Sequence, residues 1–213
     1  IISISKDNSR RVNLNNVRII YNPVSDNFFT PNPHIVKNPN QILFVGGTHR
    51  AKGLGLLMDS MQYLNSEIQV VLAGYYPIKS IKNNIVHRKF FKILREYPDQ
   101  ISLVGVLSSV QIAEEMCKSS LILFPAIQPH FARPIVEAYA TKTPVIATNL
   151  KGMDEIVKNE ITGYMVEPSP ESLATKILEA LSKQDVLKEM GEEGYKFALE
   201  NFRAEHSAKK VQD

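Results

Sequence analysis

The stretch that decides the fold covers residues 128–157, QPHFARPIVEAYATKTPVIATNLKGMDEIV. Its pattern predicts a loop, a helix whose first residue is Pro134, a short apolar strand and a second loop. Proline suits the first helical position, because its missing N–H group would have no partner there. The loop at 128–133 would then lie at a helix N-terminus, where unpaired N–H groups and the helix dipole favour anions. We therefore expect a diphosphate on this loop, within reach of Glu137 one turn later.

Short apolar runs and helix-length amphipathic segments alternate along the rest of the chain. The runs lack the apolar–polar alternation of a half-exposed strand, which predicts a parallel sheet covered by helices on both faces. We therefore expect an α/β, Rossmann-like fold. Strands are expected at 17–21, 41–45, 68–73, 101–104, 121–124, 144–147 and 164–166.

Capping residues mark the start of two helices. Ser108 and Gln111 have the spacing of a capping box, and Ser169 can cap a helix in which Pro170 takes the first position. The segment 26–40 is rich in Pro and Asn and has no period, so we expect an irregular surface connection there. Helices are expected at 53–64, 86–97, 109–118, 170–181 and 185–201, with a further loop at 75–84.

Composition excludes several classes of protein. At 213 residues and 44% hydrophobic, the chain can bury a substantial core, as one large domain or a domain with an appendage. The formal net charge of +3 is too small to predict a nucleic-acid partner. The single cysteine, Cys117, excludes an internal disulfide and fits a reducing compartment. No apolar run approaches the roughly 20 residues that a membrane-spanning helix needs.

Three loops follow strands of the expected sheet, at 46–52, 105–108 and 124–133. Ligands of open parallel sheets bind outside the carboxyl ends of the strands. These loops are therefore expected to line one site.

Several short segments resemble glycosyltransferase family four, the retaining group 1 enzymes of the GT-B fold. The resemblance covers about residues 18–181, and the order and spacing of its pieces make it specific. It implies the C-terminal, nucleotide-sugar-binding half of such an enzyme. The matching pieces are IIYNPV at 19–24 with Phe29, FVG at 44–46 with Lys52-Gly53, Glu137-Ala138, TPVIAT at 143–148, EIV at 155–157 and TGY at 162–164.

The resemblance also implies how the chain is divided. Residues 1–24 would be the end of the N-terminal acceptor domain and the interdomain connection, and 25–201 the nucleotide-sugar-binding domain. Residues 202–213 would begin a C-terminal tail or a return helix. The chain begins at Ile1 without methionine, so we interpret it as a domain excised from a longer protein whose acceptor half is missing here.

The first loop contains Gly46 and Gly47, which are expected to contact the donor. In the family, a lysine here contacts the nucleotide diphosphate, and Lys52 occupies that position. Its ammonium group would offset the charge that grows on the leaving group as the glycosidic bond breaks. The family usually has an arginine where this chain has Gly47. We expect Lys52 and Arg50 to be the catalytic residues, with an exposed loop arginine as the alternative for Arg50, and His49 to be exposed.

Glu137 matches the second glutamate of the family's paired-glutamate motif, which accepts hydrogen bonds from the ribose hydroxyls. A carboxylate suits this role because it can accept two O–H donors at once. The alternative is an acid that only favours the helix dipole. The first glutamate of the motif, which contacts the transferred sugar, is replaced by Pro129.

The residues after Pro129 are expected to contact the distal phosphate and the sugar. Phe131 and Ala132 stand where the family has Phe-Gly, whose backbone amides donate to these groups, and Ala132 tolerates a positive φ less well than glycine. His130 and Arg133 are additions of this chain, and either can supply the contact that Pro129 lacks. Arg133 can also bind a phosphate or an acidic sugar in bidentate fashion.

The remaining loops would complete the site. Val106 and Leu107, after Gly105, resemble the segment on which the base docks, the alternative being a plain strand-to-helix turn. Glu155 and Lys142 are expected to have structural roles. A lysine at Lys142 suits a helix C-terminus, although the family usually places glycine there.

The resemblance implies a retaining glycosyltransferase that moves a sugar from a UDP- or GDP-sugar to a glycan or lipid-linked acceptor. It implies no tightly bound cofactor and no metal held by protein carboxylates, and the sequence has no Asp-X-Asp triplet. Two alternatives are a non-catalytic nucleotide-sugar-binding module and a GT-B-fold epimerase. The chain alone is expected to be inactive, because the active site of this fold lies between two domains. The expected compartment is the cytoplasm, with peripheral attachment at the inner membrane face for lipid-linked acceptors.

Overall fold

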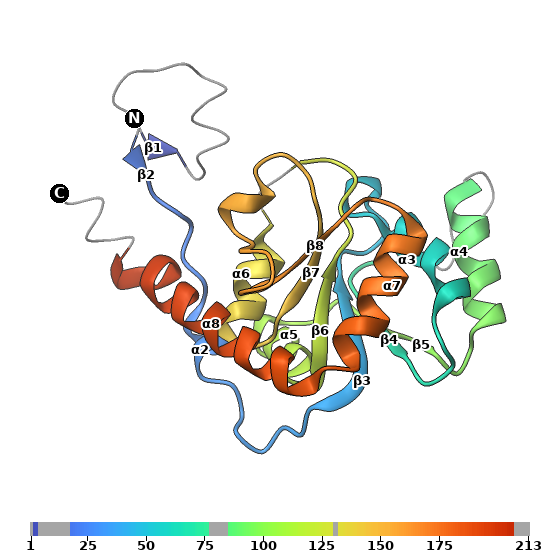
Figure 1. Cartoon of the computed structure of the whole chain (residues 1–213), viewed down its shortest axis with the longest axis horizontal. Coiled ribbons are helices and arrows are strands. Elements are labelled where there is room, and N and C mark those ends of the chain that lie inside the picture. The colour runs from blue at the N-terminus through green and yellow to red at the C-terminus, as the bar shows by residue number, and fades with distance from the viewer. Residues whose placement is uncertain (1, 4–17, 77–84, 130–131, 207–213) are drawn as a thin grey trace.

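The computed structural model describes residues 2–3, 18–76, 85–129 and 132–206 of the chain. Within these residues lies a six-stranded, all-parallel sheet with the order β5-β4-β3-β6-β7-β8 (Figure 1), and β1 and β2 form a separate parallel pair. This confirms the expected α/β, Rossmann-like fold. The strands are β1 (Ile2–Ser3), β2 (Arg18–Ile19), β3 (Asn38–Val45), β4 (Gln69–Ala73), β5 (Ile101–Gly105), β6 (Ser119–Phe124), β7 (Val145–Thr148) and β8 (Gly163–Val166).

Helices connect the strands and cover both faces of the sheet (Figure 1). They are α2 (Asp26–Phe29), α3 (Leu54–Ser60), α4 (Ile85–Glu96), α5 (Ser109–Lys118), α6 (Arg133–Ala140), α7 (Pro170–Leu181) and α8 (Gln184–Phe202), with the 3-10 turns η1 (Arg50–Lys52), η2 (Met61–Tyr63) and η3 (Met153–Glu155).

Strand β3 shows why helices must cover both faces. Ile42 and Phe44 belong to one buried core, and Leu43 between them belongs to the other. Helices α3, α4 and α7 pack on the first face, and α2, α5 and α6 on the second. Each such side chain contributes about 1.5–3 kcal/mol when it is fully buried, so the two-sided core is the main stabilising feature of the fold.

Helix α8 passes from one layer to the other. Its Leu187 and Met190 lie in the first core, whereas Ala198 and Phe202 lie in the second. The helix packs on α6, α7 and β8, and its Gly191 lies against Lys142 and Pro144, just before the start of β7. At its end, the Phe202 carbonyl accepts a hydrogen bond of 2.8 Å from the amide of Val24. This bond joins the end of α8 to the segment that precedes α2.

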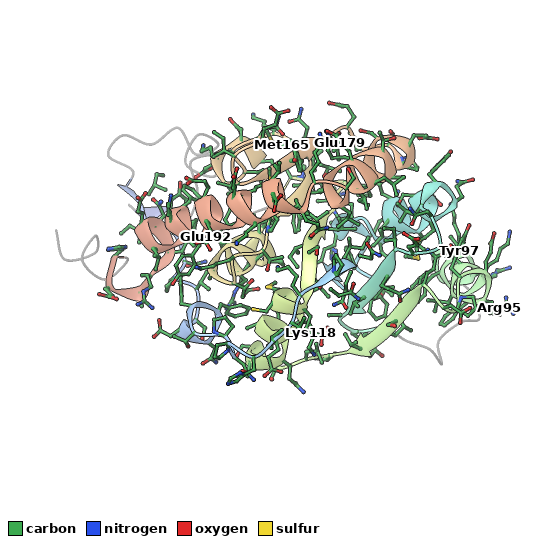
Figure 2. All side chains as sticks on the ribbon, turned by 60° about the horizontal axis from the view of Figure 1, so that its bottom comes forward. Arg95, Tyr97, Lys118, Met165, Glu179 and Glu192 are labelled. Atoms are coloured by element: carbon green, nitrogen blue, oxygen red, sulfur yellow. The ribbon has the colours of Figure 1, made fainter. Side chains whose placement is uncertain are left out.

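Apart from Glu137 on α6, the charged side chains described in the structure are at least partly exposed. Figure 2 shows Arg95 of α4 and Glu192 of α8 toward opposite ends of the molecule, with Glu179 on α7. Hydrogen bonds from Lys176 and Lys183 lower the pKa of Glu179 to about 2. Exposed pairs of this kind add little stability because water screens them.

The predicted caps are confirmed, with one shift of position. The Ser108 side chain and Gln111 form both bonds of a capping box on α5, and the Ser169 side chain accepts from the amide of Ser172 on α7. Helix α6 begins one residue before Pro134, with Ala132 as its N-cap. The prediction that Pro134 is the first helical residue is therefore wrong by one position, because proline is also tolerated elsewhere in the first turn.

Several predicted boundaries also need correction. The segment 26–40 is not wholly irregular, because α2 forms there and buries Phe28 and Phe29, and β3 starts at Asn38. One turn of helix is too short to show a period. Of the described part of the strand expected at 17–21, only Arg18–Ile19 forms a strand, and the helix expected at 53–64 ends as the 3-10 turn η2. Most of the loop expected at 75–84 lies outside the described residues.

The end of α6 explains the lysine at position 142. Lys142 has φ 57°, a left-handed conformation that usually favours glycine. Its ammonium group lies 3.0 Å from the Glu192 carboxylate and 4.9 Å from the ring centroid of Tyr195. These contacts with α8 agree with the expected structural role.

Candidate functional site

The order of the strands creates a switch point between β3 and β6. From β3 the chain proceeds outward through β4 to β5, and from β6 it proceeds the other way through β7 to β8. The loops that leave the carboxyl ends of β3 and β6 therefore diverge and leave a crevice, which is where open α/β sheets bind ligands.

Backbone contacts join these two loops. The amide of Ile127, after β6, donates to the carbonyl of Ala51, after β3, over 3.0 Å. Gly53 has φ 80°, and a β carbon there would stand 1.6 Å from the Pro125 carbonyl oxygen. Only glycine permits this approach, so η1, which carries Lys52, is fixed against the loop that leads into α6.

The first glycine loop packs on the end of β4. The amide of Gly46 donates to Ala73 and that of Thr48 to Tyr75, over 3.0 and 3.2 Å. Gly47 between them has φ 60°, and a β carbon there would stand 2.8 Å from the Tyr75 carbonyl oxygen. An arginine at position 47 would need this backbone to move, so the observed loop conformation favours glycine there.

The two cations of this loop differ in their surroundings. Lys52 is half-buried, and its side chain passes over Gly46. Its charge is near enough to Glu137 to favour the ionised carboxylate. Arg50 and His49 are exposed, and within the described part of the chain no carboxylate pairs with Arg50. The structure thus brings Lys52, but not Arg50, toward Glu137.

Glu137 is the buried acid of the site. It lies on α6 with 9% of its surface exposed, and its Oε1 accepts a hydrogen bond from Arg133 Nε over 2.8 Å. Burial raises the pKa of the Glu137 carboxyl above its usual value, while Arg133 and, more weakly, Lys52 oppose that rise. A buried carboxylate that faces two cations is a candidate functional group. An acid that only interacted favourably with the helix dipole would not need to be buried.

The loop before α6 is only partly described. His130 and Phe131, both predicted to contact the donor, lie outside the described residues, and Pro129 is exposed. Ala132 is fully buried with φ −93°, and its carbonyl accepts from the amide of Ile135. Its φ is negative, so the loop does not require glycine at this position.

The loop after β5 reaches the same edge of the sheet. Gly105 has φ 74°, and its carbonyl accepts from the amide of Gly74 over 2.7 Å. Val106 is 74% exposed, whereas Leu107 is half-buried against the second core. An exposed apolar side chain at a strand end is an available surface for a flat ring.

Tyr21 is a residue that the sequence did not single out. Its Oη donates to Glu155 Oε1 over 2.9 Å, and it packs on Phe202 with ring centroids 5.0 Å apart. Burial and the Glu155 carboxylate raise the pKa of Tyr21. The bond connects the segment after β2 with the loop after β7, which agrees with the structural role expected for Glu155. Tyr21 lies in the segment 19–24 that resembles the family, but the sequence of that segment does not predict its hydrogen bond to Glu155.

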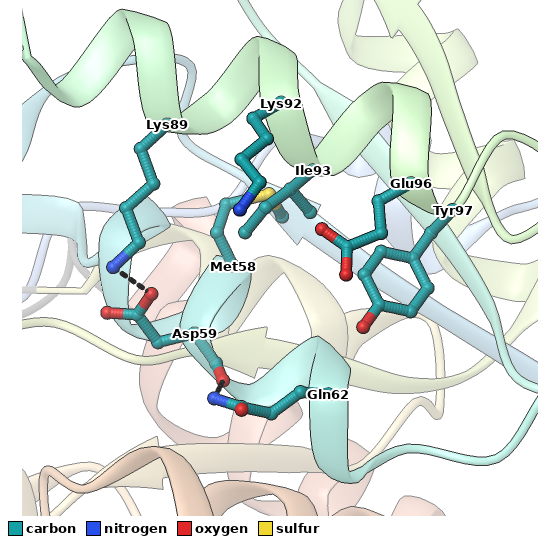
Figure 3. Close-up of a pocket in the computed structure, with 8 residues that line it drawn as sticks. All are labelled: Met58, Asp59, Gln62, Lys89, Lys92, Ile93, Glu96 and Tyr97. Atoms are coloured by element: carbon teal, nitrogen blue, oxygen red, sulfur yellow. Dashed lines mark hydrogen bonds and ion pairs between the residues drawn. The ribbon is translucent and has the colours of Figure 1, made fainter.

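A separate hollow of about 240 Å³ lies between α3 and α4 (Figure 3). Lys89 forms an ion pair with Asp59 across it, and Gln62 Nε2 donates to the Asp59 carbonyl over 3.0 Å. Its lining comes from the end of α3, from η2, and from α4 with the adjoining Tyr97, and it includes no residue of the loops that follow β3 and β6. This hollow is therefore distinct from the crevice at the switch point.

No helix among the described residues is both long and apolar enough to span a bilayer. The same residues contain no group of three or more His, Cys, Asp or Glu side chains that could hold a metal ion.

Known proteins resemble this chain over most of its length. Residues 26–197 match the family described as "Glycosyl transferases group 1". An uncharacterized glycosyltransferase of Methanocaldococcus jannaschii is 32% identical over 209 residues, which are 93% of this chain and 54% of that protein. CapM of Staphylococcus aureus, a capsular polysaccharide biosynthesis glycosyltransferase, is 23% identical over 177 residues, which are 81% of this chain and 45% of that protein.

The fold also matches solved structures. HepE of Anabaena, solved in complex with UDP, superposes with a TM-score of 0.85 at 17% identity, over 99% of this chain and 62% of that chain. The present chain spans about half the length of the curated relatives it matches. Its parallel sheet with flanking helices is one half of a GT-B fold. By its family match and by its 32% identity to an archaeal glycosyltransferase, the chain belongs to the glycosyltransferase group 1 family.

Proposed function

We propose that this chain is the donor-binding domain of a retaining glycosyltransferase that uses a nucleoside-diphosphate sugar. The observation that carries the proposal is the backbone contact at the switch point of the sheet, which fixes η1 with Lys52 against the loop that leads to Glu137 on α6. Glu137 supplies a buried carboxylate for hydroxyl donors, and Lys52 a cation for phosphates. These are the two kinds of group that the ribose and the diphosphate of such a donor require.

The remaining loops accommodate the rest of the donor. The diphosphate would rest between Lys52 and the N-terminus of α6, where the positive end of the helix dipole favours anions. The base would lie against Val106 and Leu107. In the sheet, β5 lies three strands from β6, a separation of about 14 Å at ordinary strand spacing, so an extended nucleotide can reach from one loop to the other. UDP, which HepE of Anabaena binds in its crystal structure, is the nucleotide we propose first, with GDP second.

In the proposed transfer, the bond from the anomeric carbon to the distal phosphate breaks, and the acceptor oxygen bonds to that carbon on the same face. The acceptor proton passes to the departing phosphate. The protein then contributes orientation and electrostatic stabilisation, mainly through Lys52 and the dipole at the N-terminus of α6, with Arg50 available from solvent. CapM acts in capsular polysaccharide biosynthesis, which supports a glycan or lipid-linked acceptor, bound by a second domain, for the complete enzyme.

The proposed domain limits follow the contacts at the two ends. Residues 25–201 would form the donor domain, with 1–24 as the interdomain connection and 202–213 as the start of a return segment. The bond between Val24 and Phe202, where these parts meet, supports this division. We place the enzyme in the cytoplasm, peripheral to the inner membrane face where its acceptor is lipid-linked.

Calorimetry with UDP, GDP and ADP tests the proposal on this chain. We expect one of them to bind, and Glu137→Ala to weaken it by about 1.5–3 kcal/mol, the value of hydrogen bonds to a charged group. Glu192→Ala, on α8, is the control and should leave binding unchanged. Absence of binding by all three nucleotides would reject the donor site.

A non-catalytic nucleotide-sugar-binding module is the second candidate, favoured by Pro129 in place of the sugar-contacting glutamate. The complete protein distinguishes the two, because transfer to an acceptor would be measured only if the module is catalytic.

A further inference from the structure

Arg133 and Glu137 form an ion pair inside the candidate site. Arg133 Nε lies 2.8 Å from Glu137 Oε1, and the two side chains are 68% and 11% exposed. Arg133 thus uses one of its donors and keeps the others in solvent. No described residue donates a hydrogen bond to Oε2 of Glu137. Arg133 therefore orients the carboxylate through Oε1, and Oε2 remains available to accept a hydrogen bond from a ligand.

This pair is not explained by helix stability. Arg133 is the first residue of α6, and a cation at a helix N-terminus opposes the helix dipole. The order of the charges, with the cation four residues before the anion, is also the less favourable one for a pair on a helix. The arginine therefore stands where an anion, and not the helix, favours it.

We infer that Arg133 is a positioning residue that keeps the Glu137 carboxylate ionised and oriented while the nucleotide binds. The inference rests on the proposed function, in which Glu137 accepts hydrogen bonds from ribose. Only the ionised form offers acceptors alone, because a protonated carboxyl presents a donor as well. Burial works against ionisation at this position, so Glu137 depends on its cations.

The described charges that face Glu137 are Arg133, on its own helix, and Lys52, from η1. They are not equivalent once a donor is bound. A diphosphate brings negative charge beside Lys52 and neutralises it, so Lys52 no longer favours the Glu137 anion. Arg133, whose Nε is hydrogen-bonded to the carboxylate over 2.8 Å, keeps that contact and remains its counterion, although the diphosphate would also lie near the start of α6. Without Arg133, binding of the diphosphate should force Glu137 to take up a proton.

Calorimetry of UDP binding from about pH 5.5 to about pH 8, in two buffers of different ionisation enthalpy, measures both affinity and proton uptake. For Arg133→Gln we expect affinity about tenfold below that of the unaltered chain at the acid end, recovery toward the alkaline end, and net proton uptake on binding. Arg133→Lys should restore most of both properties. Lys183→Gln, which removes an exposed pair with Glu179 at the same spacing, is the matched control and should change neither.

Three outcomes would overturn the inference. The first is a pH profile of UDP affinity for Arg133→Gln that is identical to that of the unaltered chain. The second is an equal loss of affinity at every pH, which would indicate that Arg133 contacts UDP directly. The third is proton uptake by the double variant Arg133→Gln/Glu137→Gln that equals that of Arg133→Gln alone. If the unaltered chain binds no nucleotide, the proposed function fails separately. The inference is then read from the titration of the Glu137 carboxyl by NMR without ligand, where Arg133→Gln must move the midpoint to higher pH, and an unmoved midpoint rejects it.

Discussion

Gly53 lies against Pro125 so closely that a β carbon on the glycine would stand 1.6 Å from the proline carbonyl oxygen. With the hydrogen bond from Ile127 to Ala51, this contact interlocks the loops on the two sides of the switch point. The relative placement of Lys52 and α6 therefore depends on backbone packing, and not on the two charged side chains themselves.

Gly53→Ala should destabilise the fold by about 2–4 kcal/mol, because it combines a positive φ with a clash against backbone. Gly55 is the matched control, since it lies two residues later in α3 and a β carbon there would meet nothing within 4 Å. Gly55→Ala should be neutral or stabilise by up to about 1 kcal/mol, as expected in a helix. Urea denaturation measures both, and equal effects would show that the contact is not rigid.

Lys52→Met should weaken UDP by about 1.5–3 kcal/mol, since it removes a charged partner of the diphosphate. Uridine, which has no phosphate, should bind equally to both proteins. Lys188→Met, on the exposed side of α8, is the control for loss of a positive charge. An equal loss of uridine and UDP would mean that Lys52 shapes the loop and does not contact phosphate.

Glu137→Gln should stabilise the unliganded fold by about 0.5–1 kcal/mol near neutral pH, although it weakens nucleotide binding. The pKa of Glu137 is raised in the folded state by burial, so between its unfolded and folded values the folded chain holds more protons. Stability from this group is therefore present at low pH and is lost as pH rises through the folded value. The amide can still accept from Arg133 Nε.

Thermal unfolding of Glu137→Gln and the unaltered chain at about pH 5 and about pH 8 measures this difference, which should be larger at the alkaline value. A variant that is less stable than the unaltered chain at about pH 8 would show that the pair with Arg133 outweighs the cost of burying the charge.

The sequence predicted most of the fold because its strands are short apolar runs, and only a sheet covered on both faces buries such runs. Its capping residues fixed the starts of α5 and α7 for a local reason, since cap and helix are adjacent in the chain. Helix α2 was missed because four residues cannot show a period. The match to family segments placed Lys52 and Glu137 near one crevice, and the structure supports that placement without testing their roles.

Other features depend on contacts that sequence patterns do not contain. The bond from Tyr21 to Glu155 joins residues 134 positions apart, and nothing local to either predicts it. The Arg133–Glu137 pair has helical spacing, but spacing does not reveal that Glu137 is buried. The left-handed backbone of Gly47 is a further feature that the sequence pattern did not reveal.

Tyr21→Phe should lower the free energy of unfolding by about 1–2 kcal/mol, because it leaves the half-buried Glu155 carboxylate without that donor. Tyr63→Phe is the matched control, since the Tyr63 hydroxyl donates to Glu171 at the exposed surface, and it should produce no measurable change. A double-mutant cycle with Glu155→Gln separates this bond from the packing of Tyr21 on Phe202. A coupling energy near zero would mean that the loop after β7 is held in place without the Tyr21–Glu155 bond.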